Sequence, residues 1–103
     1  MATPVPIPLN DANMLRIIRD LAQDSANVRL RKHAKARMAL RGITFTQVLA
    51  CLRKGSIDEP AHTSIQGDWK CTLRHQHAGD VVHVTAAIEK DESGKWVAVV
   101  TVF

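Results

Sequence analysis

The sequence contains no carboxylate between Asp24 and Asp58, although eight of its fourteen lysine and arginine residues lie in that gap. Like charges four residues apart destabilise an isolated helix by a few tenths of a kcal/mol. A helix that carries such charges without acidic partners is therefore expected to hold them for an anionic ligand. The formal charge of +4 over 103 residues also favours acidic partners, without identifying them.

Other absences narrow the class of protein. No apolar run approaches the roughly 18 residues of a membrane span, and residues 1–9 lack the positive start and apolar block of a signal peptide. The only two cysteines, Cys51 and Cys71, fall in apolar patterns and are expected to be buried and unpaired. We therefore expect a cytoplasmic protein that does not bind membranes.

The motifs of several enzyme classes are also missing. The chain has no C-x-x-C, no H-E-x-x-H, no cluster of acidic ligands and no glycine-rich phosphate loop. His75 and His77 share one side of an extended segment, but two histidines at a strand end are usually accidental. We expect no metal and no cofactor. In a chain without tyrosine, Trp69 and Trp96 fit strand-core positions better than a base-stacking platform.

The hydrophobic pattern divides the chain into three parts. Alternating prolines predict that residues 1–9 form an extended arm. A helix capped by Asn10 or Asp11 is expected to fill nearly all of residues 10–27, which form an N-terminal helical extension. Residues 28–103 start with a short extended segment and are expected to form a single α+β domain.

Two further helices are expected early in this domain. The first carries the basic residues described below and ends at Gly42. The second begins at Thr44, which can form a capping box with Gln47, and ends at Gly55. Two helices joined by a short glycine-containing turn resemble a DNA-binding helix-turn-helix. We rank that interpretation last, because the second helix is mostly apolar and lacks a polar recognition face.

From about residue 57 the pattern changes from helical to alternating. Ile57 begins a short edge strand, and residues 69–74, 82–88 and 96–103 predict three strands joined by hairpin-length loops. The predicted architecture is an α+β fold with N-terminal helices packed on one face of a C-terminal antiparallel β-sheet. The helices are expected to cover Trp69, Leu73, Val82, Val84 and Ile88, and the other face to display Lys70, Thr72, Arg74, His83 and Thr85.

The candidate site begins with the first of these two helices. His33, Arg37 and Arg41 recur at a spacing of four, which places them in one stripe. Together with the polar face of the sheet, this stripe predicts a site for a phosphodiester. The competing interpretation is that the arginine heads and the polar sheet face are simply solvated.

The same helix and the last strand resemble a known family. The run His33-Ala34, Arg37-Met38, Arg41-Gly42-Ile43 is similar to the signature HA..RM..RGI of a small bacterial family catalogued as domain of unknown function 4258. The terminal Val100-Thr101-Val102-Phe103 resembles the closing strand of that family. The resemblance covers about residues 28–103. Arg31 departs from it, because family members often have Ser or Thr there as a helix cap.

That family is grouped by fold with RelE-like toxin endoribonucleases, so the resemblance implies a RelE-like domain and metal-independent RNA cleavage. In such chemistry a base helps the ribose 2′-hydroxyl attack the adjacent phosphate, and cations stabilise the charge that develops. The resemblance makes His33 the general acid or base. The phosphate contacts would come from Arg37, Arg41 and Arg74, with a hydroxyl donor from Thr101. Further substrate contacts would come from Arg31, Lys35, Lys70 and His83.

The resemblance implies RNA as the substrate and a cognate antitoxin protein as a partner. A homodimer is the other assembly that we consider. The alternative function is a non-catalytic adaptor or nucleic-acid-binding module that uses the same basic surface. In that case the arginines matter for binding, affinity falls steeply with salt, and His33 is dispensable.

Overall fold

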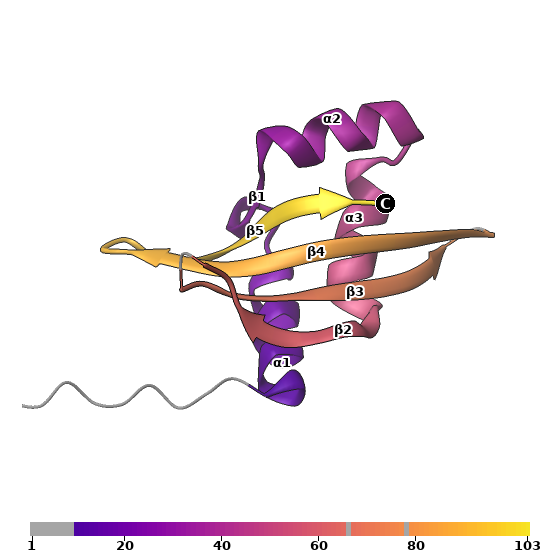
Figure 1. Ribbon diagram of the computed structural model, residues 1–103. Helices are drawn as coiled ribbons and strands as arrows, with labels where there is room; N and C mark the ends of the chain where they lie inside the picture. The colour runs from indigo at the N-terminus through magenta and orange to yellow at the C-terminus, as the bar shows by residue number, and fades with distance from the viewer. Residues whose placement is uncertain (1–9, 66, 78) are drawn as a thin grey trace, which may run out of the picture.

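The computed structural model describes residues 10–65, 67–77 and 79–103. The predicted proline arm, residues 1–9, lies outside the described residues. Figure 1 shows the helices and strands that the described residues form. In chain order these are α1 (Asp11–Ala22), the 3-10 helix η1 (Ser25–Asn27), β1 (Val28–Leu30), α2 (Lys32–Arg41), α3 (Phe45–Lys54), β2 (Ser56–Thr63), β3 (Trp69–His77), β4 (Asp80–Asp91) and β5 (Gly94–Val102).

The strands form one mixed sheet in the order β1-β5-β4-β3-β2. Strands β2 to β5 are antiparallel neighbours, whereas β1 pairs in parallel with β5, with Val28 opposite Val97 and Leu30 opposite Val99. The α+β class, the order of helices before strands and the antiparallel pairing of the C-terminal strands are confirmed, and the parallel edge strand β1 is an addition that the sequence does not predict. A three-residue extended segment carries no signal for its partner, and in the structure it pairs with the otherwise open edge of β5.

Helix α1 begins where the sequence predicts and ends earlier. The Asn10 side chain accepts a hydrogen bond from the Asn13 N–H at 2.8 Å and caps the helix. The helix ends at Ala22 rather than near residue 25. The Asp24 carboxylate accepts the Ala26 N–H at 2.9 Å and starts the separate turn η1, which explains the earlier end.

Helix α2 ends, and helix α3 begins and ends, where the sequence predicts. Gly42 ends α2 with a φ of 67°, in the left-handed region that favours glycine. Thr44 and Gln47 form the predicted capping box at the start of α3, and Gly55 follows its last residue. No helix in the described part of the chain is long and apolar enough to cross a membrane.

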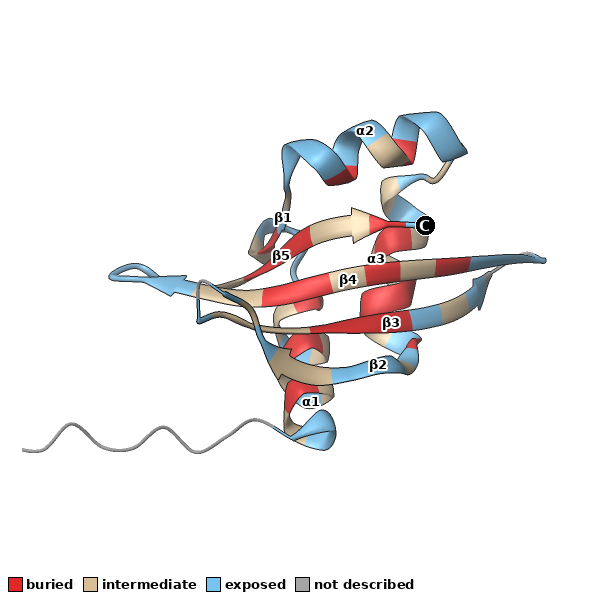
Figure 2. Cartoon of the chain, viewed as in Figure 1, coloured by how far each residue is buried: buried red, intermediate tan, exposed pale blue. Residues whose placement is uncertain are grey.

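The core lies between one face of the sheet and the helices, and α2 contributes Ala34 and Met38 to it. Helices α1 and α3 pack together and cover one face of the sheet, and α2 lies beside β5 (Figure 1). Buried residues concentrate in the strands and on the sides of α1 and α3 that face them (Figure 2). As predicted, Leu73, Val82 and Val84 are buried, and Trp69 and Ile88 pack against the same core. The two cysteines are buried and free, also as predicted.

Strand β5 contains a bulge that decides which face carries Thr101. Thr85 lies opposite Thr101, but the next pair is Ala86 with Val99, so Val100 is an extra residue in the ladder. A bulge of this kind reverses the alternation of side chains beyond it. Thr101 therefore lies on the outer face, which α1 and α3 leave uncovered.

Candidate functional site

The basic stripe of α2 is accessible and has no acidic partner. His33, Lys35 and Arg41 are exposed, and Arg37 is half-buried. Among the described residues, no carboxylate forms an ion pair with any of these four side chains. A helix rises by 1.5 Å per residue, so the stripe extends for about 12 Å from His33 to Arg41. Helix α2 thus presents a continuous basic surface rather than a network of surface ion pairs.

The first turn of α2 adds backbone donors to this surface. Arg31 is the N-cap residue, and its side chain makes no hydrogen bond to the first turn. The first N–H groups of a helix favour anions when no side chain caps them. His33 belongs to the same turn, because it is the second residue of the helix. An anion bound here would lie close to an imidazole and to the positive end of a helix dipole.

Arg37 and Arg41 have different surroundings. The Nε atom of Arg37 is buried and has no hydrogen-bond partner within the part of the chain that the structure describes. Burial of this atom restricts the guanidinium, which reduces the entropy that a ligand would have to remove. Arg41 lines a cavity of about 200 Å³ at the α2–α3 turn, together with Asp80 and Phe103. The two arginines therefore differ in burial, although they share one stripe.

A row of three threonines crosses the outer face of the sheet. Thr72, Thr85 and Thr101 lie opposite one another on β3, β4 and β5. The hydroxyls of Thr72 and Thr85 hydrogen-bond at 2.9 Å, and Thr72 also donates to the Glu59 carboxylate at 3.3 Å. Thr72 is only 1 % exposed, so its hydroxyl stabilises the sheet. Thr101 is half-buried and ends the row on β5, the strand beside which α2 packs.

His83 lies on the same outer face and is held by two neighbours. Its ring stacks on Phe103, with the centroids 5.0 Å apart and the planes 2° from parallel. Its Nε2 atom lies 3.6 Å from Oδ2 of Asp58. Arg74 lies opposite His83 in the register and is exposed, and Lys70 is half-buried further along the same strand. The predicted sheet residues therefore share a face, as expected.

Sequence reasoning missed the two carboxylates on this face. Asp58 reaches His83, and Glu59 reaches Thr72. Both residues belong to β2, where the register with β3 shifts on either side of Glu59. The sequence predicts only that a short edge strand begins at Ile57. No local signal marks a register shift, so the contacts of these carboxylates could not be found from spacing.

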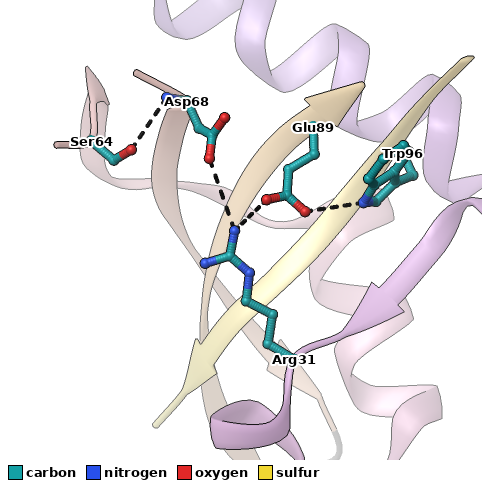
Figure 3. Close-up of polar contacts among 5 residues, drawn as sticks. All are labelled: Arg31, Ser64, Asp68, Glu89 and Trp96. Carbon is teal, nitrogen blue, oxygen red and sulfur yellow. Dashed lines mark hydrogen bonds and ion pairs between the residues drawn. The ribbon is translucent and has the colours of Figure 1, made fainter. Parts of the chain in front are cut away.

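Arg31 is engaged inside the protein rather than free. Its guanidinium pairs with the Glu89 carboxylate and lies 4.0 Å from Asp68 (Figure 3). Glu89 in turn accepts a hydrogen bond from the Trp96 indole N–H at 3.1 Å. In contrast to the basic residues of α2, Arg31 thus has its charge compensated. The sequence does not reveal this compensation, because both carboxylates are distant from Arg31 along the chain.

The structure brings the predicted site residues together as two groups. The helix group lies on α2, which packs beside β5, and the sheet group lies on β3, β4 and β5 (Figure 1). No hydrogen bond or ion pair among the described residues joins the two groups. The helix group is His33, Lys35, Arg37 and Arg41, and the sheet group is Lys70, Arg74, His83 and Thr101.

The chemistry that these groups offer is limited. Within residues 10–65, 67–77 and 79–103, no three histidine, cysteine or acidic residues are placed to hold a metal ion. Burial raises the pKa of the Cys51 and Cys71 thiols to about 12, so neither is a nucleophile near neutral pH. What the two groups supply is proton transfer by histidine and anion binding by arginine and lysine.

A comparison with known protein families matches residues 30–103 to DUF4258, a domain of unknown function. The matched segment contains α2, α3 and strands β2 to β5, so the helix group and the sheet group both fall within it. Helix α1 lies outside it. No curated protein and no solved structure gives a significant match to this chain.

Proposed function

The chain belongs to the DUF4258 family, and we propose that it is a metal-independent endoribonuclease of the RelE-like toxin type. The observation that supports this proposal is the α2 stripe, which exposes a histidine among cations and forms no ion pair with a carboxylate of the described residues. A solvated helix face would gain stability from acidic partners at a spacing of four. Their absence leaves the cations available for the phosphates of a nucleic acid strand.

In the proposed reaction the ribose 2′-hydroxyl attacks the adjacent phosphorus, and the bond to the 5′-oxygen of the next nucleotide breaks. His33 takes the proton of the attacking hydroxyl or gives one to the leaving oxygen, and water exchanges the other proton. Arg37 and Arg41 bind the phosphate oxygens, for which guanidinium groups offer bidentate geometry. Thr101, on the strand beside α2, supplies a hydroxyl donor. Lys35 and the basic residues of the sheet group hold flanking parts of the strand.

RNA cleavage by three purified proteins in EDTA tests this proposal. Loss of a general acid or base typically lowers a rate by about 10²–10⁴-fold, so His33→Ala is expected to lose that much activity. His62→Ala is the matched control, because the His62 ring is also partly exposed and makes its polar contacts with Glu59 and Pro60 on its own strand. The control is expected to cleave at the wild-type rate. Equal rates for wild type and His33→Ala would refute the assigned role.

A non-catalytic RNA-binding module is the second candidate, and one observation favours it. Among the described residues, none forms a hydrogen bond or ion pair that would orient the His33 ring. Phosphate binding by arginine needs no such orientation, whereas general acid–base catalysis does. This candidate predicts that wild type and His33→Ala bind single-stranded RNA equally and that neither cleaves it.

The proposed function implies a protein partner and a cellular location. A toxin of this kind needs a cognate antitoxin, and an acidic protein that covers α2 would block the cations directly. Leu40, which follows His33 by two helical turns and is 76 % exposed, offers such a protein an apolar contact. An RNA substrate also implies that the protein acts in the cytoplasm.

A further inference from the structure

A cavity in the described part of the chain lies away from the outward stripe of α2. It has a volume of about 570 Å³, within the range of roughly 300–1,000 Å³ that is usual for small-molecule sites. It lies where β3 begins and where the β4–β5 hairpin approaches the β2–β3 loop. Its walls include both tryptophans of the chain, two carboxylates and two lysines, namely Trp69, Trp96, Asp68, Glu89, Lys90 and Lys95.

The Trp96 ring is fixed in place. Its N–H donates to Oε1 of Glu89 at 3.1 Å, and the other oxygen of that carboxylate accepts from Arg31 (Figure 3). The guanidinium of Arg29 covers one face of the ring, 3.9 Å from the ring centroid. A ligand can therefore stack only on the opposite face. Because both oxygens of Glu89 are engaged, this carboxylate positions the indole and leaves little capacity for a ligand.

Asp68 is the carboxylate with acceptor capacity to spare. Its backbone is held in the β2–β3 loop, because its N–H donates to Oγ of Ser64 at 3.2 Å (Figure 3). Its C=O also accepts the Ser64 N–H at 2.7 Å. Its side chain, 33 % exposed, is approached only loosely by Arg31 at 4.0 Å. The cavity thus offers a planar aromatic wall and a carboxylate whose backbone is fixed.

We propose that this cavity binds a guanine base of the RNA. A carboxylate can accept two parallel hydrogen bonds from guanine, whose N1–H and N2–H₂ groups are adjacent on one edge. Adenine, cytosine and uracil present no such pair of adjacent donors. Single-stranded RNA is commonly recognised by stacking on aromatic side chains together with hydrogen bonds to base edges. Lys90 and Lys95 are exposed at the same cavity and are available to the phosphate of that nucleotide.

The site is connected to the proposed catalytic surface. Arg31, which pairs with Glu89 beside the cavity, is the N-cap of α2 and stands two residues before His33. A strand that placed its base in the cavity would continue towards the first turn of α2. The inference rests on the proposed function in naming RNA as the ligand, and it adds the base that the enzyme selects.

The test uses the four nucleoside 5′-monophosphates as probes and the two indole N–H signals of the ¹⁵N-labelled full chain as the readout. GMP is expected to shift both signals and to bind at least about tenfold more tightly than AMP, CMP or UMP, the selectivity of one bidentate pair. Trp69→Phe assigns the two signals. Asp68→Asn is expected to lose the preference for GMP, while Asp20→Asn, which removes an exposed carboxylate of α1, keeps it.

Each outcome decides the inference. Equal shifts with all four nucleotides would show stacking without base selection. No shift with any of them would show that the cavity is no nucleotide site. Either result would overturn the guanine proposal. The backbone signals of Asp68→Asn show whether this variant is folded. If it is unfolded, the double variant Lys90→Gln/Lys95→Gln, which is expected to bind GMP more weakly than wild type, replaces it. GMP binding without RNA cleavage would reject the proposed nuclease but keep this site. RNA cleavage without GMP binding would do the reverse.

Discussion

Arg37 and Arg41 are predicted to determine much of the salt dependence of RNA binding. Each phosphate of a single strand that a cation neutralises contributes about −0.7 to the slope of log K against log salt concentration. Neither arginine has a carboxylate partner among the described residues, so both are free to make such a contact. Two contacts account for about 1.4 of the slope, which corresponds to an affinity loss of about sevenfold for a fourfold rise in salt.

The assay is fluorescence anisotropy of a labelled single-stranded RNA, titrated at several KCl concentrations and at a fixed pH. The protein carries His33→Ala so that the RNA stays intact. Adding Arg37→Gln and Arg41→Gln is expected to make the slope shallower by about 1.4. The control, Arg16→Gln with Lys54→Gln, removes two exposed charges from α1 and α3. An unchanged slope in the Arg37/Arg41 variant, or an equal change in the control, would refute the assignment of phosphate contacts to α2.

Three further predictions follow from the packing and the titrating groups. In Gly55→Ala the new Cβ would lie 2.4 Å and 3.0 Å from two backbone carbonyl oxygens. We therefore expect the free energy of unfolding to fall by about 1–3 kcal/mol, which a lower urea midpoint would show. The Cys51 and Cys71 thiols, with pKa values of about 12, are expected to resist iodoacetamide at pH 8 until the protein is unfolded, as mass spectrometry can show. Hydrogen bonds from the Ser93 hydroxyl and N–H lower the pKa of Asp91. The ionised carboxylate therefore stabilises the turn at pH values above the ordinary carboxyl pKa, and this stabilisation is lost as the pH falls through the lowered pKa of Asp91. Ser93→Ala should raise that pKa in an NMR titration, and an unchanged value would contradict the explanation.

The parts of the fold that could be predicted depend on local interactions. The Thr44–Gln47 capping box and the left-handed Gly42 are decided by residues a few positions apart, so the sequence contains the whole signal. The alternating strands of the meander are equally local. The parallel pairing of β1 with β5 joins residues almost 70 positions apart, such as Val28 and Val97, and no spacing rule identifies such a partner.

The same distinction applies to the candidate site. The spacing of His33 and Arg41 on α2 is a helical property, and the structure does place them on one accessible surface. Arg31 looked like part of that surface, because its partner Glu89 is 58 residues away. Asp58 was missed because a register shift in β2 brings it to His83. Long-range partners therefore decide which of the predicted charges are free and which are compensated.

The central claim is cleavage by attack of the ribose 2′-hydroxyl without a metal. The most direct measurement compares a single-stranded RNA with its fully 2′-O-methylated copy, each incubated with the wild-type protein in EDTA, followed by mass spectrometry of the product ends. We expect 2′,3′-cyclic phosphate and 5′-hydroxyl ends from the RNA and no cleavage of the methylated copy. Cleavage of the methylated copy, or products with 3′-hydroxyl and 5′-phosphate ends, would contradict it.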